Sequence, residues 1–195
     1  MKPEARAHLE TPRLVLRLAE PGEAHLVVDY LDRNRAHLAQ WEPEPPKGFY
    51  GTSYWRERLL QMRREEDEGR QLRLHLFERE PVQREARVVG TIGVSNIVRG
   101  AFWSAHLGFA LDGALEGRGV MREALEAAIR YAFGPLNLHR LEANHQPHNL
   151  RSAALLRRLG FAPTGYARDY LYVAGAWRDH VQTSLINPSW SPPAS

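Results

Sequence analysis

The stretch LEGRGVMREALEAAIRYAFG, from Leu115 to Gly134, decides the fold. From Val120 onward, apolar residues recur at the spacing of one helix face, and charged residues recur on the opposite face. The helix nevertheless begins with Gly117 and Gly119, where a capping Ser, Thr, Asp or Asn is expected. A helix start carries unpaired N–H groups and a partial positive charge. Either these glycines only form a tight turn, or they keep side chains away so that an anion can bind the amides.

The neighbouring residues favour anion binding over a plain turn. Arg118 and Arg122 add positive charge one turn apart, and the segment HLGFALD (106–112) is predicted to be the strand that leads into the helix. A Walker loop is excluded because no G-K-[ST] closes the motif. A dinucleotide fingerprint fits poorly because Arg122 stands at the third glycine position, although Glu142 lies where a ribose-binding acid would be.

The composition is that of one soluble domain. The 195 residues are 43% hydrophobic and 25% charged, with no cysteine and no apolar run long enough to span a bilayer. The missing cysteine excludes disulfides, thiolate metal sites and a covalent cysteine intermediate. The N-terminal segment lacks the apolar core of a signal peptide, so we expect a cytoplasmic protein without a membrane partner. The net charge of +3 fits scattered arginines or affinity for an acidic partner such as RNA or a polyphosphate cofactor.

Hydrophobic periodicity predicts an α/β fold with a mixed central sheet flanked by helices. Strands are expected at 11–18, 72–77, 87–95, 101–111, 138–144, 161–173 and 177–186, and helices at 21–38, 52–67, 120–133 and 150–159. This order predicts a single domain over residues 1–187. Residues 188–195 form a Pro- and Ser-rich tail that we expect to be disordered.

The segment QWEPEPPKGFYGTS (40–53) is too rich in proline for a helix or a strand. Its aromatic residues Trp41, Phe49 and Tyr50 are costly to leave in water. We therefore expect a loop that faces the substrate rather than a mobile one.

The segment E-G-R-G-V-M (116–121) resembles the pyrophosphate-binding loop of the Gcn5-related N-acetyltransferases, written Q/R-x-x-G-x-G/A. Glu116 and Met121 depart from that pattern, but the loop acts mainly through backbone N–H groups. The resemblance implies a partly splayed sheet and acetyl-CoA as the co-substrate. It assigns cofactor binding to the loop residues Glu116, Gly117, Arg118, Gly119, Val120 and Met121.

Across nearly its whole length the chain is more specifically similar to the ribosomal-protein alanine N-acetyltransferases of the RimJ type. The matching stretches are TPRLVLR (11–17), WEP (41–43), SNIVRG (95–100), GRGVMREALEAAIRYAF (117–133), PHNLRSAALLRRLGF (147–161), GYARDYL (165–171) and WRDH (177–180). This similarity implies direct acetyl transfer to a protein N-terminal amine, typically the N-terminal alanine of a small-subunit ribosomal protein. An acceptor lysine, polyamine or antibiotic amine and a non-catalytic, basic RNA-binding module remain alternatives. We expect no direct DNA contact, allow association with the ribosome, and leave the oligomeric state open.

The resemblance extends to further residues around the cofactor. Asn149 caps the following helix and, by resemblance, also contacts the cofactor arm. In this family the backbone N–H groups of a splayed strand hold the oxyanion, and that strand corresponds to Leu107, Gly108, Phe109 and Ala110. No metal is expected, because His145 and His148 flank a proline and lack cysteine neighbours.

The acid and base are assigned by similarity to related enzymes. Glu142 matches the base proposed in RimI-type enzymes, and Ser152 matches the thiolate protonator proposed in RimL-type enzymes. Asp169, Glu42 or a water relay are rival bases, and Ser152 is equally compatible with a purely structural role. The acceptor is expected to pass four residues, namely Trp41, Glu42, Asn96 and Arg99.

Overall fold

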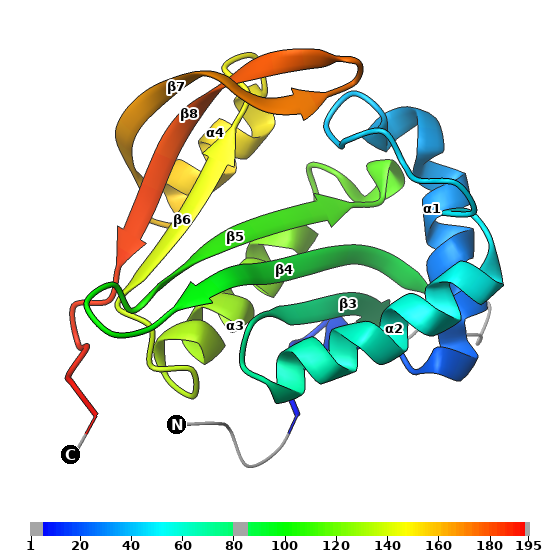
Figure 1. The fold of residues 1–195 in the computed structure, drawn as a ribbon, viewed down its shortest axis with the longest axis horizontal. Coiled ribbons are helices and arrows are strands. Elements are labelled where there is room, and N and C mark those ends of the chain that lie inside the picture. Colours follow the sequence, from blue (N-terminus) through cyan, green and yellow to red (C-terminus); the bar gives the residue numbers. More distant parts are fainter. Residues whose placement is uncertain (1–5, 80–85, 194–195) are drawn as a thin grey trace.

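A computed structural model of the chain describes residues 6–79 and 86–193. Figure 1 shows one central sheet whose strand order is β1-β2-β3-β4-β5-β6-β8-β7. The strands are β1 (His8–Glu10), β2 (Leu14–Arg17), β3 (Leu72–Glu78), β4 (Val88–Val98), β5 (Ser104–Leu111), β6 (Arg140–His145), β7 (Ala162–Val173) and β8 (Ala176–Ile186). The helices are α1 (Ala24–Leu38), α2 (Thr52–Asp67), α3 (Val120–Phe133) and α4 (Leu150–Arg158), with 3₁₀ turns at Pro21–Glu23 and Gly113–Leu115.

The predicted α/β class and the predicted order of elements are confirmed. The sequence did not reveal β1, because three residues are too few to show an alternating pattern. Helix α2 begins at Thr52 as expected, but its cap is Gly51, without a side-chain hydrogen bond.

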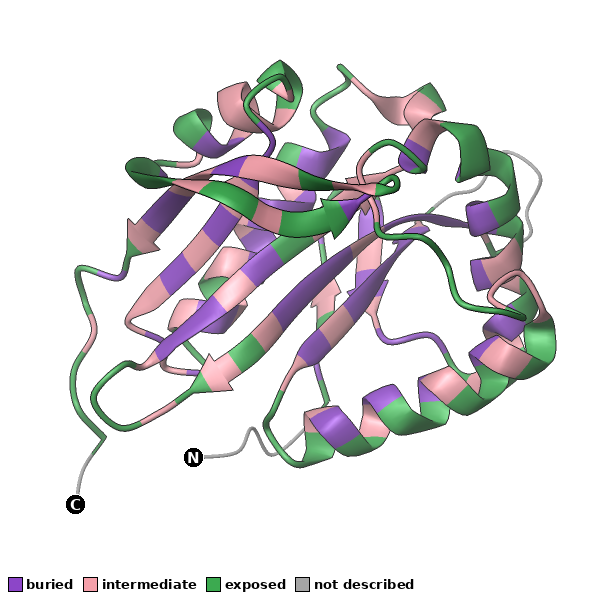
Figure 2. Cartoon of the chain, turned by 45° about the horizontal axis from the view of Figure 1, so that its top comes forward, coloured by how far each residue is buried: buried purple, intermediate pink, exposed green. Residues whose placement is uncertain are grey.

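The helices cover both faces of the sheet (Figures 1 and 2). Helices α3 and α4 contribute to a core on one face, where Leu125 and Leu156 are buried together with Leu141 of β6. Helices α1 and α2 build a second core on the other face, around Tyr30 and Leu59. The apolar stripe predicted for α3 is thus buried.

The sheet opens between β5 and β6. These strands are parallel, and in the described part of the chain their pairing covers Ser104↔Arg140, Ala105↔Leu141 and His106↔Glu142. Beyond His106 and Glu142 the two strands diverge, while each stays paired to its antiparallel neighbour. We call the space between Leu107–Leu111 and Ala143–His145 the wedge. Helices α3 and α4 both begin at its open end, so the predicted partly splayed sheet is confirmed.

The C-terminal segment lies along the closed end of the wedge strands. The buried Asn187 side chain donates to the carbonyls of Phe133 and Leu138 at 3.3 and 3.1 Å. The Trp190 ring lies 5.8 Å from that of Trp103, centre to centre. Residues 194–195 of the expected tail lie outside the described residues.

Candidate active site

Helix α3 begins without a side-chain cap. Gly117 and Gly119 both adopt left-handed φ angles, 72° and 73°, which only glycine accepts without strain. Gly119 is the N-cap, and no side chain makes a capping hydrogen bond there. Within the described ranges, no acceptor is bonded to the amides of Val120, Met121 and Arg122. A Cβ added at Gly117 would meet no atom within 4 Å, so the space in front of these amides is open.

Arg13, which directly precedes β2, forms hydrogen bonds with the turn and with the first turn of α3. Its Nη1 donates to the Arg118 carbonyl at 2.9 Å, and its Nε donates to Glu123 Oε2 at 2.6 Å. The Arg13 backbone N–H donates to the other Glu123 oxygen at 2.9 Å. Burial alone would raise the pKa of Glu123, but hydrogen bonds with Thr11 and Arg13 lower it below its ordinary value. The carboxylate therefore stays charged and fixes the first turn of α3 to the sheet.

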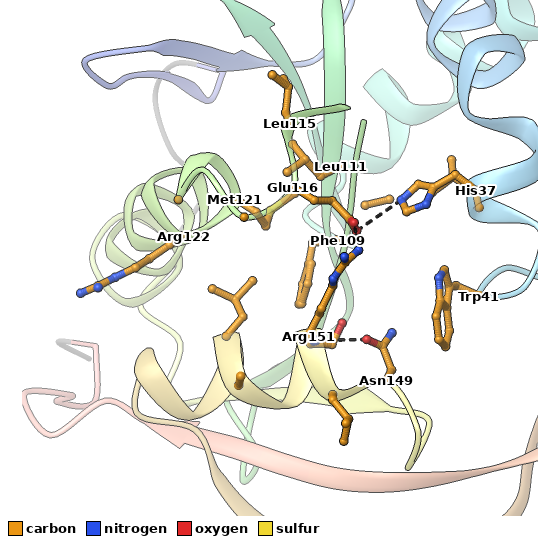
Figure 3. A pocket seen from close by; sticks show the side chains of 18 of the residues that line it. His37, Trp41, Phe109, Leu111, Leu115, Glu116, Met121, Arg122, Asn149 and Arg151 are labelled. Atoms are coloured by element: carbon orange, nitrogen blue, oxygen red, sulfur yellow. Dashed lines mark hydrogen bonds and ion pairs between the residues drawn. The ribbon is translucent and has the colours of Figure 1, made fainter. Parts of the chain in front are cut away.

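A cavity of about 710 Å³ lies in front of the α3 amides (Figure 3). It is bounded by α3, by the start of α4, by the end of β5 and by the loop after α1. Predicted site residues that line it are Trp41, Glu42, Phe109, Ala110, Glu116, Gly117, Gly119, Met121, Asn149 and Ser152. The structure therefore brings together residues from four separate segments of the sequence.

Glu116 points into the cavity rather than away from it (Figure 3). It forms an ion pair with Arg151 at the start of α4, and one of its carboxylate oxygens lies 3.4 Å from His37 Nε2. Arg122 points away from the cavity and pairs with Glu126 at 2.8 Å. Arg151 and Arg158 of α4 also line the cavity, and the motif identified neither of them.

The start of α4 forms the opposite wall. The Asn149 side chain accepts from the Ser152 N–H at 3.1 Å, so its predicted role as an N-cap is confirmed. Ser152 lines the cavity as well, one turn into the helix. Both residues are placed where they can contact a ligand bound between the two helices.

Some aromatic residues of the loop after α1 line the cavity, and others pack against each other outside it. Trp41 and Glu42 line the cavity, and the Trp41 ring lies 5.3 Å from that of His148. Phe49 and Tyr50 pack against each other instead, and the Phe49 carbonyl accepts from Trp55 Nε1 at 2.6 Å. Burial raises the pKa of Glu42, and Arg73 opposes that rise.

The remaining predicted residues lie outside the cavity lining. Leu107, Gly108, Arg118 and Val120 adjoin it in sequence on β5 and at the α3 turn. Glu142 lies at the closed tip of the wedge, where its carboxylate is 2.8 Å from Arg140 Nε and 3.5 Å from His106 Nε2. Asp169 lies in an irregular part of β7 and is exposed; its N–H donates to Asp179 at 2.9 Å.

Asn96 lies at the far end of β4, and Arg99 directly follows that strand. The cavity-lining residues of β5 pair with Gly90–Ile92, whereas Asn96 and Arg99 come four to seven residues later. Arg99 Nη1 donates to the Leu136 carbonyl at 2.5 Å, and its guanidinium lies over Trp103. The structure therefore does not bring these two residues together with the others.

Comparison with known proteins establishes the family. Residues 13–162 match the family described as "Acetyltransferase (GNAT) domain", which is more than half of the chain. The chain belongs to the GNAT acetyltransferase family. The described part of this acetyltransferase contains no helix that is long and apolar enough to cross a membrane. That part also contains no group of three or more His, Asp or Glu side chains arranged to hold a metal.

Individual relatives are similar over nearly their whole length. The [Ribosomal protein uS5]-alanine N-acetyltransferase of Escherichia coli is 41% identical over 187 residues, which cover 96% of this chain and 94% of that protein. The ribosomal-protein-S5-alanine acetyltransferase of Vibrio fischeri superposes with a TM-score of 0.89 at 36% identity, covering 95% and 100% of the two chains. The Mycobacterium smegmatis protein RimJ, solved in complex with CoA-disulfide, gives a TM-score of 0.84 at 27% identity, covering 95% and 90%.

The residues of this GNAT enzyme suit an elongated, anionic thioester. Free amides and a helix N-terminus offer a site for phosphate groups at one end of the cavity. Among the residues that the structure describes, none pairs with β5 along Leu107–Leu111 on the β6 side, so its main-chain groups can reach a ligand there. The cavity therefore offers free N–H donors at its rim and main-chain groups along β5.

Proposed function

We propose that this enzyme transfers an acetyl group from acetyl-CoA to the α-amine of a protein that begins with alanine, and that this protein is a ribosomal protein. The observation that carries the proposal is the 41% identity, over 96% of the chain, with an enzyme named for acetylating the alanine of ribosomal protein uS5. Acetylation of that N-terminus requires the enzyme to meet the ribosome or the newly made ribosomal protein.

Each bound group has residues that fit it. The diphosphate of acetyl-CoA would be held by the Gly117–Met121 turn, with Arg151 nearby and Asn149 beside the arm of the cofactor. When bound, acetyl-CoA supplies the activated acetyl group. Backbone N–H groups of Leu107–Ala110 would stabilise the oxyanion that forms on its carbonyl.

A weak base suffices for this acceptor. A protein α-amine has a pKa of about 7.7–8, whereas that of lysine is about 10.4, so the α-amine is partly free near neutral pH. Glu142 at the tip of the wedge is our first candidate for the base, and Glu42 and Asp169 are its rivals. Ser152 would protonate the departing thiolate from the wall of the cavity.

The acceptor would enter on the α1–α2 side of the sheet, past Trp41 and Glu42. Asn96 and Arg99 would contact it only if the peptide continues along β4 toward the far end of that strand.

The test uses a synthetic peptide that begins with alanine and contains one internal lysine. The same peptide with a formylated N-terminus is the control, and tandem mass spectrometry locates the acetyl group. We expect acetylation of the free α-amine alone and no product from the formylated peptide. Acetylation of the lysine in both peptides, or of neither peptide, would contradict the proposal.

A further inference from the structure

A row of residues crosses the α1–α2 face of the sheet at the level of the wedge. Arg73 of β3 pairs with Gly93 of β4, and Gly93 pairs with Gly108 of β5. The β5–β6 pairing ends at His106↔Glu142, and two residues further along β6 is Asn144. Because alternate residues of a strand share a face, Asn144 lies across the wedge from Gly108 on this face.

At Gly108 no described side chain covers the backbone of β5. A Cβ added there would meet no atom within 4 Å, so the backbone of β5 is open to a ligand. At Gly93, by contrast, an added Cβ would lie 2.8 Å from the Arg73 guanidinium, which covers that glycine. The open part of the row therefore ends at Arg73 on one side and at Asn144 on the other.

Asn144 has an unsatisfied acceptor at this position. Its Nδ2 donates to the Tyr170 hydroxyl at 3.3 Å, while its Oδ1 is buried and has no hydrogen-bond partner among the described residues. Buried polar atoms are nearly always paired, and an unpaired one in a native structure requires an explanation. An N–H donor from a substrate would supply the missing partner.

Tyr170 holds the Asn144 side chain in this orientation. The register of β7 shifts between Ala167 and Leu171, and Tyr170 lies in this irregular part of the strand. Its ring packs edge-on against the buried His180, with 5.4 Å between ring centres. Because the tyrosine hydroxyl accepts the Nδ2 hydrogen bond, the amide oxygen is left facing away from it.

We propose that the Asn144 Oδ1 atom receives an N–H of the acceptor's α-amine, with the first residue of the acceptor lying on Gly108. This inference rests on the proposed function and assigns the amine subsite within it. Tyr170 is a positioning residue that acts through Asn144. Glu142 lies two residues earlier on the same face, about 7 Å away along the strand, where a water can relay the amine proton to its carboxylate.

An amide suits this task better than a carboxylate would. A carboxylate beside the amine favours its charged form and raises its pKa, whereas a neutral amide oxygen does so only weakly. The amine must lose a proton before it attacks the acetyl carbonyl. The neutral amide oxygen of Asn144 therefore orients the amine and still allows it to deprotonate near neutral pH.

The test compares Asn144→Ala, Asn144→Asp and Tyr170→Phe with the wild-type enzyme on the alanine peptide. Tyr166→Phe is the matched control, because it removes an exposed hydroxyl from the same strand, there bonded to Asp179. We expect Asn144→Ala to raise the peptide KM about 10-fold or more. The affinity of this variant for coenzyme A should stay within twofold of the wild-type value. Its Tm should fall by less than the increase in the peptide KM suggests, because the lost oxygen had no partner in the described part of the protein.

The other variants separate binding from folding. Asn144→Asp should move the acid limb of the kcat profile to higher pH, because the new carboxylate raises the pKa of the bound amine. Tyr170→Phe should give a smaller increase in the peptide KM than Asn144→Ala, and Tyr166→Phe should leave it unchanged. An unchanged peptide KM and pH profile in both Asn144 variants would overturn this inference and leave the proposed function intact. A wild-type enzyme that does not acetylate the alanine peptide would overturn both.

Discussion

The most direct perturbation of the α3 turn replaces Gly119 with Asp and, in a second variant, with Asn. The two side chains have nearly the same shape, and both are among the residues that best tolerate a left-handed backbone. The position has room for either, because an added Cβ would lie no closer than 3.7 Å to Arg13 Nη2. With φ at 73°, either variant costs about 1–2 kcal/mol of backbone strain. The two therefore differ in charge and in little else.

The magnitude of the charge effect follows from Coulomb's law. A carboxylate about 6 Å from a diphosphate carrying two charges, at an effective dielectric constant of about 40, costs about 3 kcal/mol. That corresponds to roughly 100-fold weaker binding of coenzyme A to Gly119→Asp than to Gly119→Asn. An Asp at an N-cap also bonds the first helix amides itself, so the Asp variant should be at least as stable as the Asn variant.

The assay is calorimetric titration of both variants with coenzyme A, together with Tm measurements. We expect the Asp variant to lose affinity and keep its Tm relative to the Asn variant. Equal affinities in the two variants would refute the assignment of the diphosphate to this turn.

Three further predictions follow from the same geometry. Arg13→Ala removes the hydrogen bond to the Arg118 carbonyl and should raise the KM for acetyl-CoA several-fold in steady-state assays, whereas an unchanged KM would show that the turn holds its shape alone. Glu116→Gln removes a negative charge from the cavity and should tighten coenzyme A binding several-fold at low salt; weaker binding in the titration would contradict this. Burial lowers the pKa of His75 to about 3. The imidazole therefore stays neutral in the folded chain at pH values below about 6.5, where it becomes protonated in the unfolded chain. Urea unfolding should therefore show stability falling by roughly 1.4 kcal/mol per pH unit from about pH 6.5 toward pH 3, and His75→Gln should lose that part of the slope.

The sequence predicted the fold well because its decisive signals are local. The helical periodicity after Val120, the two glycines before it and the Asn149 cap each depend on residues within one turn of each other. The same locality explains why the turn could be proposed as a diphosphate site before its surroundings were known.

The parts that escaped prediction depend on contacts between distant segments. Arg13 lies 105 residues before the Arg118 carbonyl that it binds, and no local pattern links the two. The pairing of Tyr170 with Asn144 joins β7 to β6 across 26 residues and depends on an irregular strand register. Asn96 is expected from the sequence to meet the acceptor together with Trp41 and Glu42, but the length of β4 places it at the far end of that strand.

The measurement that tests the central claim most directly is a crystal structure of the enzyme with coenzyme A. We expect the diphosphate to accept hydrogen bonds from the amides of the Gly117–Met121 turn and the thiol to lie in the wedge between β5 and β6. A diphosphate bound elsewhere, or a turn whose amides are capped by a side chain of the protein, would contradict the account.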